Sequence, residues 1–175
     1  MREDTTCESP LPAPATLVRL LDGGAPSHPA IRVPNGPTVT YDSLRSQVRF
    51  LAGQLNGLGL GHGDRVAIVL PNGLESIISF LAVTAAGATA ASLNPAATAE
   101  EFRFYLEDTD ARALITPSQG GEDARKVASA STIKIGASVD AEGWVRFSTP
   151  EAQVSPSLAG FPSRDDLALV LHTSG

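Results

Sequence analysis

The chain has 175 residues, of which 42% are hydrophobic and 18% charged, and its formal net charge is −6. These values are typical of soluble globular proteins, so we expect one domain or a large part of one and exclude general disorder. The acidic balance, with no basic run, argues against a nucleic-acid-binding surface. The single cysteine, Cys7, excludes an internal disulfide and indicates a reducing compartment, which we take to be the cytoplasm.

The N-terminal end differs in composition from the rest of the chain. Residues 1–13 contain acids and prolines but no apolar stretch, so they are predicted to be a disordered leader and not a secretory signal. No later stretch approaches the roughly 18 apolar residues that a membrane span needs. Residues 14–175 are therefore expected to form the folded part.

The first predicted elements are short. Thr16 is a candidate N-cap for a helix that carries leucines on one face. Segments 30–33 and 38–41 flank a Pro-Asn-Gly-Pro turn and predict a hairpin. From Tyr41, apolar residues recur every three or four positions until Gly57, which predicts a long amphipathic helix.

Strands then alternate with helices. Strands are predicted at 65–70, 88–93, 113–116, 133–139, 144–147 and 167–171, and helices at 74–86, 98–108 and 122–130. The helix at 98–108 opens with Thr98 and Glu101 in the spacing of a capping box. This alternation requires crossover connections, so the fold class is α/β, a doubly wound and mostly parallel sheet flanked by helices.

The last strand, an apolar run that we expect to be buried, delivers the sequence His-Thr-Ser-Gly to one edge of the sheet. Ligands of doubly wound sheets bind beyond the carboxyl ends of the strands, and glycine with neighbouring hydroxyls suits an anion-binding loop. Taken alone, Thr-Ser-Gly after a strand is an ordinary turn. The residues by themselves therefore leave both interpretations open.

Other candidate chemistry is weak. His28, His62 and His172 have no partner at metal-ligand spacing, no Cys/His cluster exists, and no Gly-x-Ser-x-Gly elbow occurs. We predict no metal site and no catalytic residue here. The group Phe102, Phe104 and Tyr105 is interpreted as core, and the glycine-rich stretch after the 41–57 helix as a helix stop and a turn.

The order of several motifs resembles one family. Thr-Tyr-x-x-Leu at 40–44, GDRVAIVLPNG at 63–73, SLNPAATAEEFRFYLEDTDARALIT at 92–116 and HTSG at 172–175 are similar to the N-terminal part of AMP-forming acyl-CoA synthetases of the adenylate-forming superfamily. The resemblance covers nearly the whole chain after the leader. Within the family it is greatest to oxalate–CoA ligases and fatty-acid–CoA ligases.

This resemblance implies the rest of the interpretation. Residues 14–175 would be a partial AMP-binding domain, and Thr173, Ser174 and Gly175 would be the first residues of the loop that wraps the ATP phosphates. The complete enzyme would join a carboxylic acid to coenzyme A through an acyl-adenylate, with ATP and Mg²⁺. The remaining motifs of the family are absent, so these 175 residues alone are expected to be inactive.

Three alternatives stay open. The chain is also compatible with a truncated binding or regulatory module that associates with other subunits, or with itself, through an exposed sheet edge. A non-functional remnant of a synthetase gene is the second alternative, and a free-standing nucleotide binder of another family is the third. The identity of the acid (oxalate, fatty or aryl), the oligomeric state and a peroxisomal location are left open too.

Overall fold

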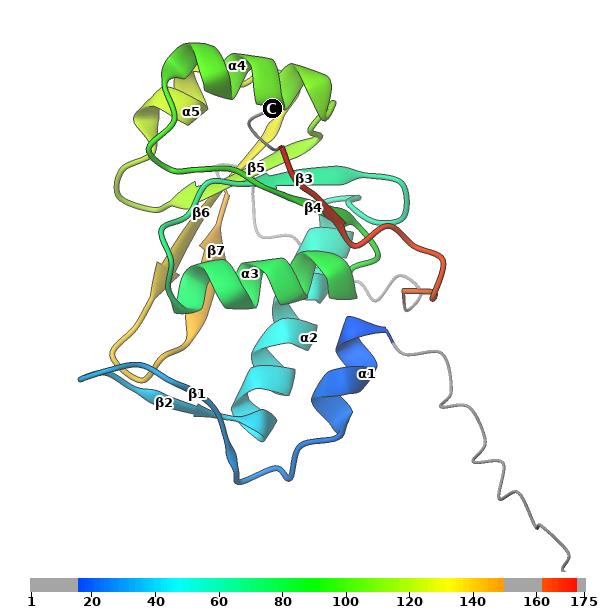
Figure 1. Ribbon diagram of the computed structural model, residues 1–175, viewed down its shortest axis with the longest axis vertical. Coiled ribbons are helices and arrows are strands. Elements are labelled where there is room, and N and C mark those ends of the chain that lie inside the picture. Colours follow the sequence, from blue (N-terminus) through cyan, green and yellow to red (C-terminus); the bar gives the residue numbers. More distant parts are fainter. Residues whose placement is uncertain (1–15, 150–161, 173–175) are drawn as a thin grey trace, which may run out of the picture.

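The computed structural model describes residues 16–149 and 162–172, so the predicted leader at 1–13 and Cys7 lie outside the described residues. Two sheets are present, a β-hairpin and a six-stranded sheet with helices on both faces (Figure 1). The helices are α1 (Leu17–Asp22), α2 (Tyr41–Gly57), α3 (Leu74–Ala85), α4 (Ala99–Asp108) and α5 (Glu122–Val127). The strands are β1 (Pro29–Arg32), β2 (Thr38–Thr40), β3 (Arg65–Ile68), β4 (Thr89–Ser92), β5 (Ala113–Pro117), β6 (Ile133–Val139), β7 (Val145–Ser148) and β8 (Leu169–Val170).

The large sheet has the strand order β7-β6-β5-β3-β4-β8. Every neighbouring pair is parallel except β6 and β7, which form an antiparallel edge. The chain moves from β3 outward to β4 and then returns past β3 to β5 and β6. This reversal of direction is what defines a doubly wound sheet, so the predicted fold class is confirmed.

Each face of the sheet has its own core. One layer, α2 and α3, covers the side chains of Val66, Ile68 and Ile115, all almost fully buried. The other layer, α4 and α5, covers Ala67 and Leu114, which come from the neighbouring positions of the same strands. Because successive strand residues point to opposite faces, the continuous apolar runs predicted in the sequence correspond to strands buried on both sides.

The predicted caps are present. Thr16 accepts a hydrogen bond from the amide of Arg19 at the start of α1. At α4 the Thr98 hydroxyl accepts from the Glu101 amide (3.3 Å), and the Glu101 carboxylate accepts from the Thr98 amide (2.7 Å). The predicted capping box is therefore confirmed.

The hydrogen bonds of this capping box affect the pKa of Glu101. The Thr98 amide, and after it the Thr98 hydroxyl, lower the pKa of Glu101 from its ordinary value of 4.5. A lowered folded pKa means that the stabilisation is present above the unfolded pKa and is lost as pH falls through the folded pKa. We expect carboxyl NMR shifts of Glu101 to titrate below pH 4.5. Thr98→Val should move that midpoint upward, and an unmoved midpoint would contradict the assignment.

Two predictions about buried residues were wrong. The segment 167–171 was expected to be a buried strand, but β8 spans only Leu169–Val170, and Leu167 and Leu171 are 61% and 60% exposed. The reason is that β8 is the edge strand of the six-stranded sheet, and Leu169 itself, which pairs with Ala90, is 37% exposed. Phe104 was expected in the core, but it lies on the outer surface of α4, 59% exposed.

Candidate functional site

The carboxyl edge of the parallel strands is the place where a ligand site is expected. The chain leaves β3 toward α3 on one face, whereas it leaves β4 and β5 toward α4 and α5 on the other. Adjacent strands whose connections diverge in this way form the point at which doubly wound sheets bind ligands. The segments that follow β3, β4, β5 and β8 therefore frame the candidate site.

Several polar groups follow these strand ends. The Asn94 side chain after β4 accepts a hydrogen bond from the Ala96 amide at 3.0 Å. The buried Thr116 hydroxyl in β5 accepts from Arg125 Nε at 2.6 Å. Helix α3 begins at Gly73 with no side chain capping its first amides. Asn94 and Thr116 are thus occupied by local bonds, and the start of α3 offers amide donors and the positive end of a 12-residue helix.

The last described residue, His172, is held by α4. Its Nε2 lies 3.0 Å from Oδ2 of Asp108, and its ring lies 4.6 Å from the ring of Tyr105. The His172 side chain is 17% exposed. In Figure 1 the red segment that contains β8 runs up to α4, so residues distant in sequence meet where the strand ends.

The predicted phosphate-binding residues follow directly. Thr173, Ser174 and Gly175 lie outside the described residues, so their role stays a prediction. The structure does show that β8 is parallel to β4 and that the chain leaves it at the carboxyl edge. The contact of His172 with Asp108 was missed, because the two residues are 64 positions apart and no local pattern connects them.

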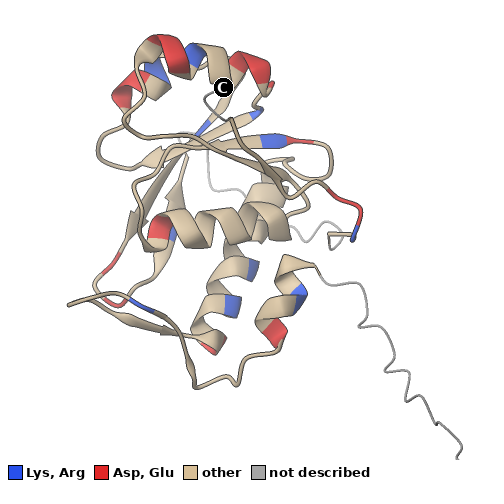
Figure 2. Cartoon of the chain, in the orientation of Figure 1, with Lys and Arg blue, Asp and Glu red and all other residues tan. Residues whose placement is uncertain are grey.

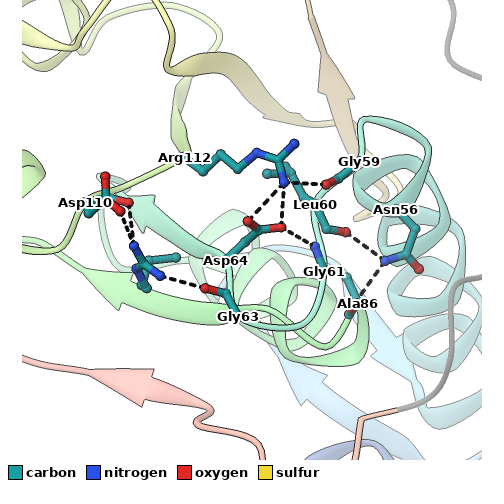
Figure 3. A network of polar contacts seen from close by, with 10 residues as sticks. Asn56, Gly59, Leu60, Gly61, Gly63, Asp64, Ala86, Asp110 and Arg112 are labelled. Atoms are coloured by element: carbon teal, nitrogen blue, oxygen red, sulfur yellow. Dashed lines mark hydrogen bonds and ion pairs between the residues drawn. The ribbon is translucent and has the colours of Figure 1, made fainter.

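A polar network lies at the opposite, amino edge of the sheet (Figure 3). Nη1 of Arg112 donates to both carboxylate oxygens of Asp64 at 3.0 Å and to the Gly59 carbonyl at 2.7 Å. Asp64 also accepts from the Gly61 amide at 2.8 Å. Nearby, Arg65 pairs with Asp110. These bonds join the segments that precede β3 and β5, so the network stabilises the place where the chain enters these two strands.

This network gives a matched pair of variants. Asp64→Ala should lower the free energy of unfolding by about 1–3 kcal/mol, because it leaves the Gly61 amide without its acceptor and leaves Arg112 with only the Gly59 carbonyl. Asp110→Ala removes an exposed ion pair and should change it by at most about 1 kcal/mol. Urea denaturation of both variants measures the difference, and equal losses would contradict the role given to Asp64.

The described residues offer little else of a catalytic kind. Within 16–149 and 162–172, no three His, Cys, Asp or Glu side chains gather to hold a metal ion. In the same ranges, no helix combines the length and apolar character of a transmembrane segment. Figure 2 shows acidic and basic residues interspersed on α4 and α5. This mixture gives no basic surface for nucleic acid on these helices.

The comparisons with known proteins agree with one another. The family model described as "AMP-binding enzyme" matches residues 22–175. A probable CoA ligase of Humulus lupulus is 42% identical over 142 residues, which are 78% of this chain and 27% of that protein. The oxalate–CoA ligase of Arabidopsis thaliana is 38% identical over 170 residues, which are 91% of this chain and 33% of that protein.

The fold of the chain is also similar to that of a solved structure. The ATP-bound RpMatB-BxBclM chimera B3 superimposes with a TM-score of 0.67 at 28% identity, over 90% of this chain and 32% of that chain. The chain thus spans about a third or less of the proteins it matches. The motif resemblance, the doubly wound sheet and the match over residues 22–175 lead to one conclusion: the chain belongs to the AMP-binding enzyme family.

Proposed function

We propose that this chain supplies the first third of an ATP-dependent acid–thiol ligase. The observation that carries the proposal is β8, which runs parallel to β4 and ends at the carboxyl edge, separated by two residues in the sequence from Thr173, Ser174 and Gly175. Family membership and the two CoA ligase relatives support the enzyme class. ATP bound to the solved chimera supports the choice of nucleotide.

The proposed reaction has two steps. A carboxylate oxygen attacks the α-phosphate of ATP, which gives an acyl-adenylate and releases pyrophosphate. The thiolate of coenzyme A then attacks the acyl carbon and displaces AMP. In both steps the protein positions the reactants and neutralises charge, and the amides and hydroxyls of the loop that starts at Thr173 would hold phosphate oxygens.

The metal of such an enzyme would need few protein ligands. Among the described residues, no three His, Cys, Asp or Glu side chains gather to hold a metal ion. Mg²⁺ commonly binds through one or two carboxylates and the substrate phosphates. The chain therefore contributes the scaffold and the beginning of the phosphate loop, and we propose that these 175 residues alone are inactive.

Two measurements test the proposal. The purified chain should bind Mg-ATP more weakly than about 1 mM, or about 4 kcal/mol, in calorimetry and should form no thioester. A chimera in which residues 22–175 replace the aligned segment of the Arabidopsis oxalate–CoA ligase should form acyl-CoA from ATP, acid and CoA. The unmodified ligase is the control. Thioester formation by the chain alone would contradict inactivity, and a folded chimera without activity on any acid would contradict the proposed role.

One observation favours the second candidate, an associating module. Among the described residues, no strand pairs with the outer edge of β8. In and next to this strand, Leu167, Leu169 and Leu171 are 61%, 37% and 60% exposed. An open strand edge next to exposed apolar side chains favours association. Light scattering that shows a concentration-dependent dimer, abolished by Leu169→Lys, would support this function. A monomer at every concentration would exclude it.

A further inference from the structure

The C-terminal end of β8 is paired with the neighbouring strand β4 over a short distance only, and the residue His172 that follows it contacts helix α4. β8 pairs with β4 at two positions only, Leu169 with Ala90 and Val170 with Ala91. Helix α4, by contrast, is fixed to the sheet by the buried side chains of Phe102 and Leu106. A short edge strand without further support frays readily, so the contact of its last residues with α4 decides where the chain leaves the sheet.

The contact has a definite chemistry. The Asp108 carboxylate can only accept, so Nε2 of His172 carries the hydrogen that bridges the 3.0 Å between them. Nδ1 of His172 is buried and has no hydrogen-bond partner among the described residues. The Tyr105 ring packs at 4.6 Å on the same imidazole. The Phe104 ring lies 6.3 Å from the imidazole, in an edge-to-face arrangement. One hydrogen bond and two ring contacts, all from residues of α4, therefore hold His172.

We propose that His172 is a positioning residue, which Asp108 and Tyr105 hold on α4 so that the chain leaves β8 at a fixed place, directly before the proposed phosphate loop that starts at Thr173. This inference rests on the proposed function, because it assigns ATP to that loop. We therefore expect Asp108 to affect the binding of ATP without contacting the nucleotide. A displacement of about 1 Å at such a loop weakens catalysis by up to about a hundredfold.

The first arm of the test needs no catalysis. Hydrogen exchange of the peptide 167–175 is measured in the purified chain by mass spectrometry. His172→Ala and Asp108→Ala should each raise its exchange rate at least about fivefold, and the double variant should add nothing, as for two residues that act through one contact. Asp108→Asn keeps an acceptor for Nε2 and should restore protection. Glu107→Ala, on the same helix without this contact, is the control.

The second arm uses the chimera described above. His172→Ala and Asp108→Ala should raise KM for ATP about tenfold while KM for CoA and for the acid stays within about twofold. Unchanged exchange in the first arm, or an equal rise of all three KM values, would overturn the inference. If the unsubstituted chimera makes no thioester, the proposed function fails, and the exchange arm alone decides the role of His172.

Discussion

Replacing Gln47 with leucine should lower the free energy of unfolding by about 2–4 kcal/mol. Gln47 is 1% exposed, and its side chain joins α2 to the hairpin between β6 and β7. Its Nε2 donates to the Gly143 carbonyl at 3.2 Å, and its Oε1 accepts from the Val145 amide at 2.8 Å. Leucine leaves both backbone groups buried without partners, and each such group costs about 1–3 kcal/mol.

The same helix offers a control with the opposite expectation. Oε1 of Gln54 is buried, and within the part of the chain that the structure describes it has no hydrogen-bond partner. Gln54→Leu removes this unsatisfied acceptor, so we expect the free energy of unfolding to stay the same or to rise. Urea denaturation of both variants gives the comparison. Equal destabilisation by the two substitutions would show that leucine itself destabilises helix α2. It would contradict the role of Gln47 at the hairpin.

The repeating part of the fold could be predicted from the sequence. The apolar run 65–70, the helical spacing from Tyr41 and the Thr98–Glu101 capping box are all local patterns, and each leads to an observed element. Strands that alternate with helices leave few topologies, because crossovers between parallel strands are right-handed. The doubly wound sheet follows from those two facts.

The remaining features depend on partners that no local pattern contains. Gln47 bonds to residues 96 and 98 positions away, and His172 bonds to a carboxylate 64 positions away. The exposure of Leu167 and Leu171 depends on the place of β8 at the sheet edge, which an apolar run cannot reveal. The assignment of Thr173, Ser174 and Gly175 rests on the family resemblance and not on local chemistry.

A buried leucine and an exposed leucine should respond very differently to replacement by alanine. Leu114 lies in β5, fully buried between the sheet and the layer of α4 and α5, beside Phe102 and Ala124. Leu114→Ala removes buried methyl groups and leaves a cavity, so the free energy of unfolding should fall by about 2–5 kcal/mol. Leu171→Ala changes a side chain that is 60% exposed and should lower it by at most about 0.5 kcal/mol.

The pair of leucines also tests where the core of this chain ends. Urea denaturation of the 175-residue chain and its two variants, followed by circular dichroism, gives both differences from one set of curves. A loss above about 2 kcal/mol in Leu171→Ala would mean that the leucine is buried in solution. Such burial requires a second surface that covers Leu171. Repetition at lower protein concentration would show whether a second copy provides it, since dimer stability falls on dilution.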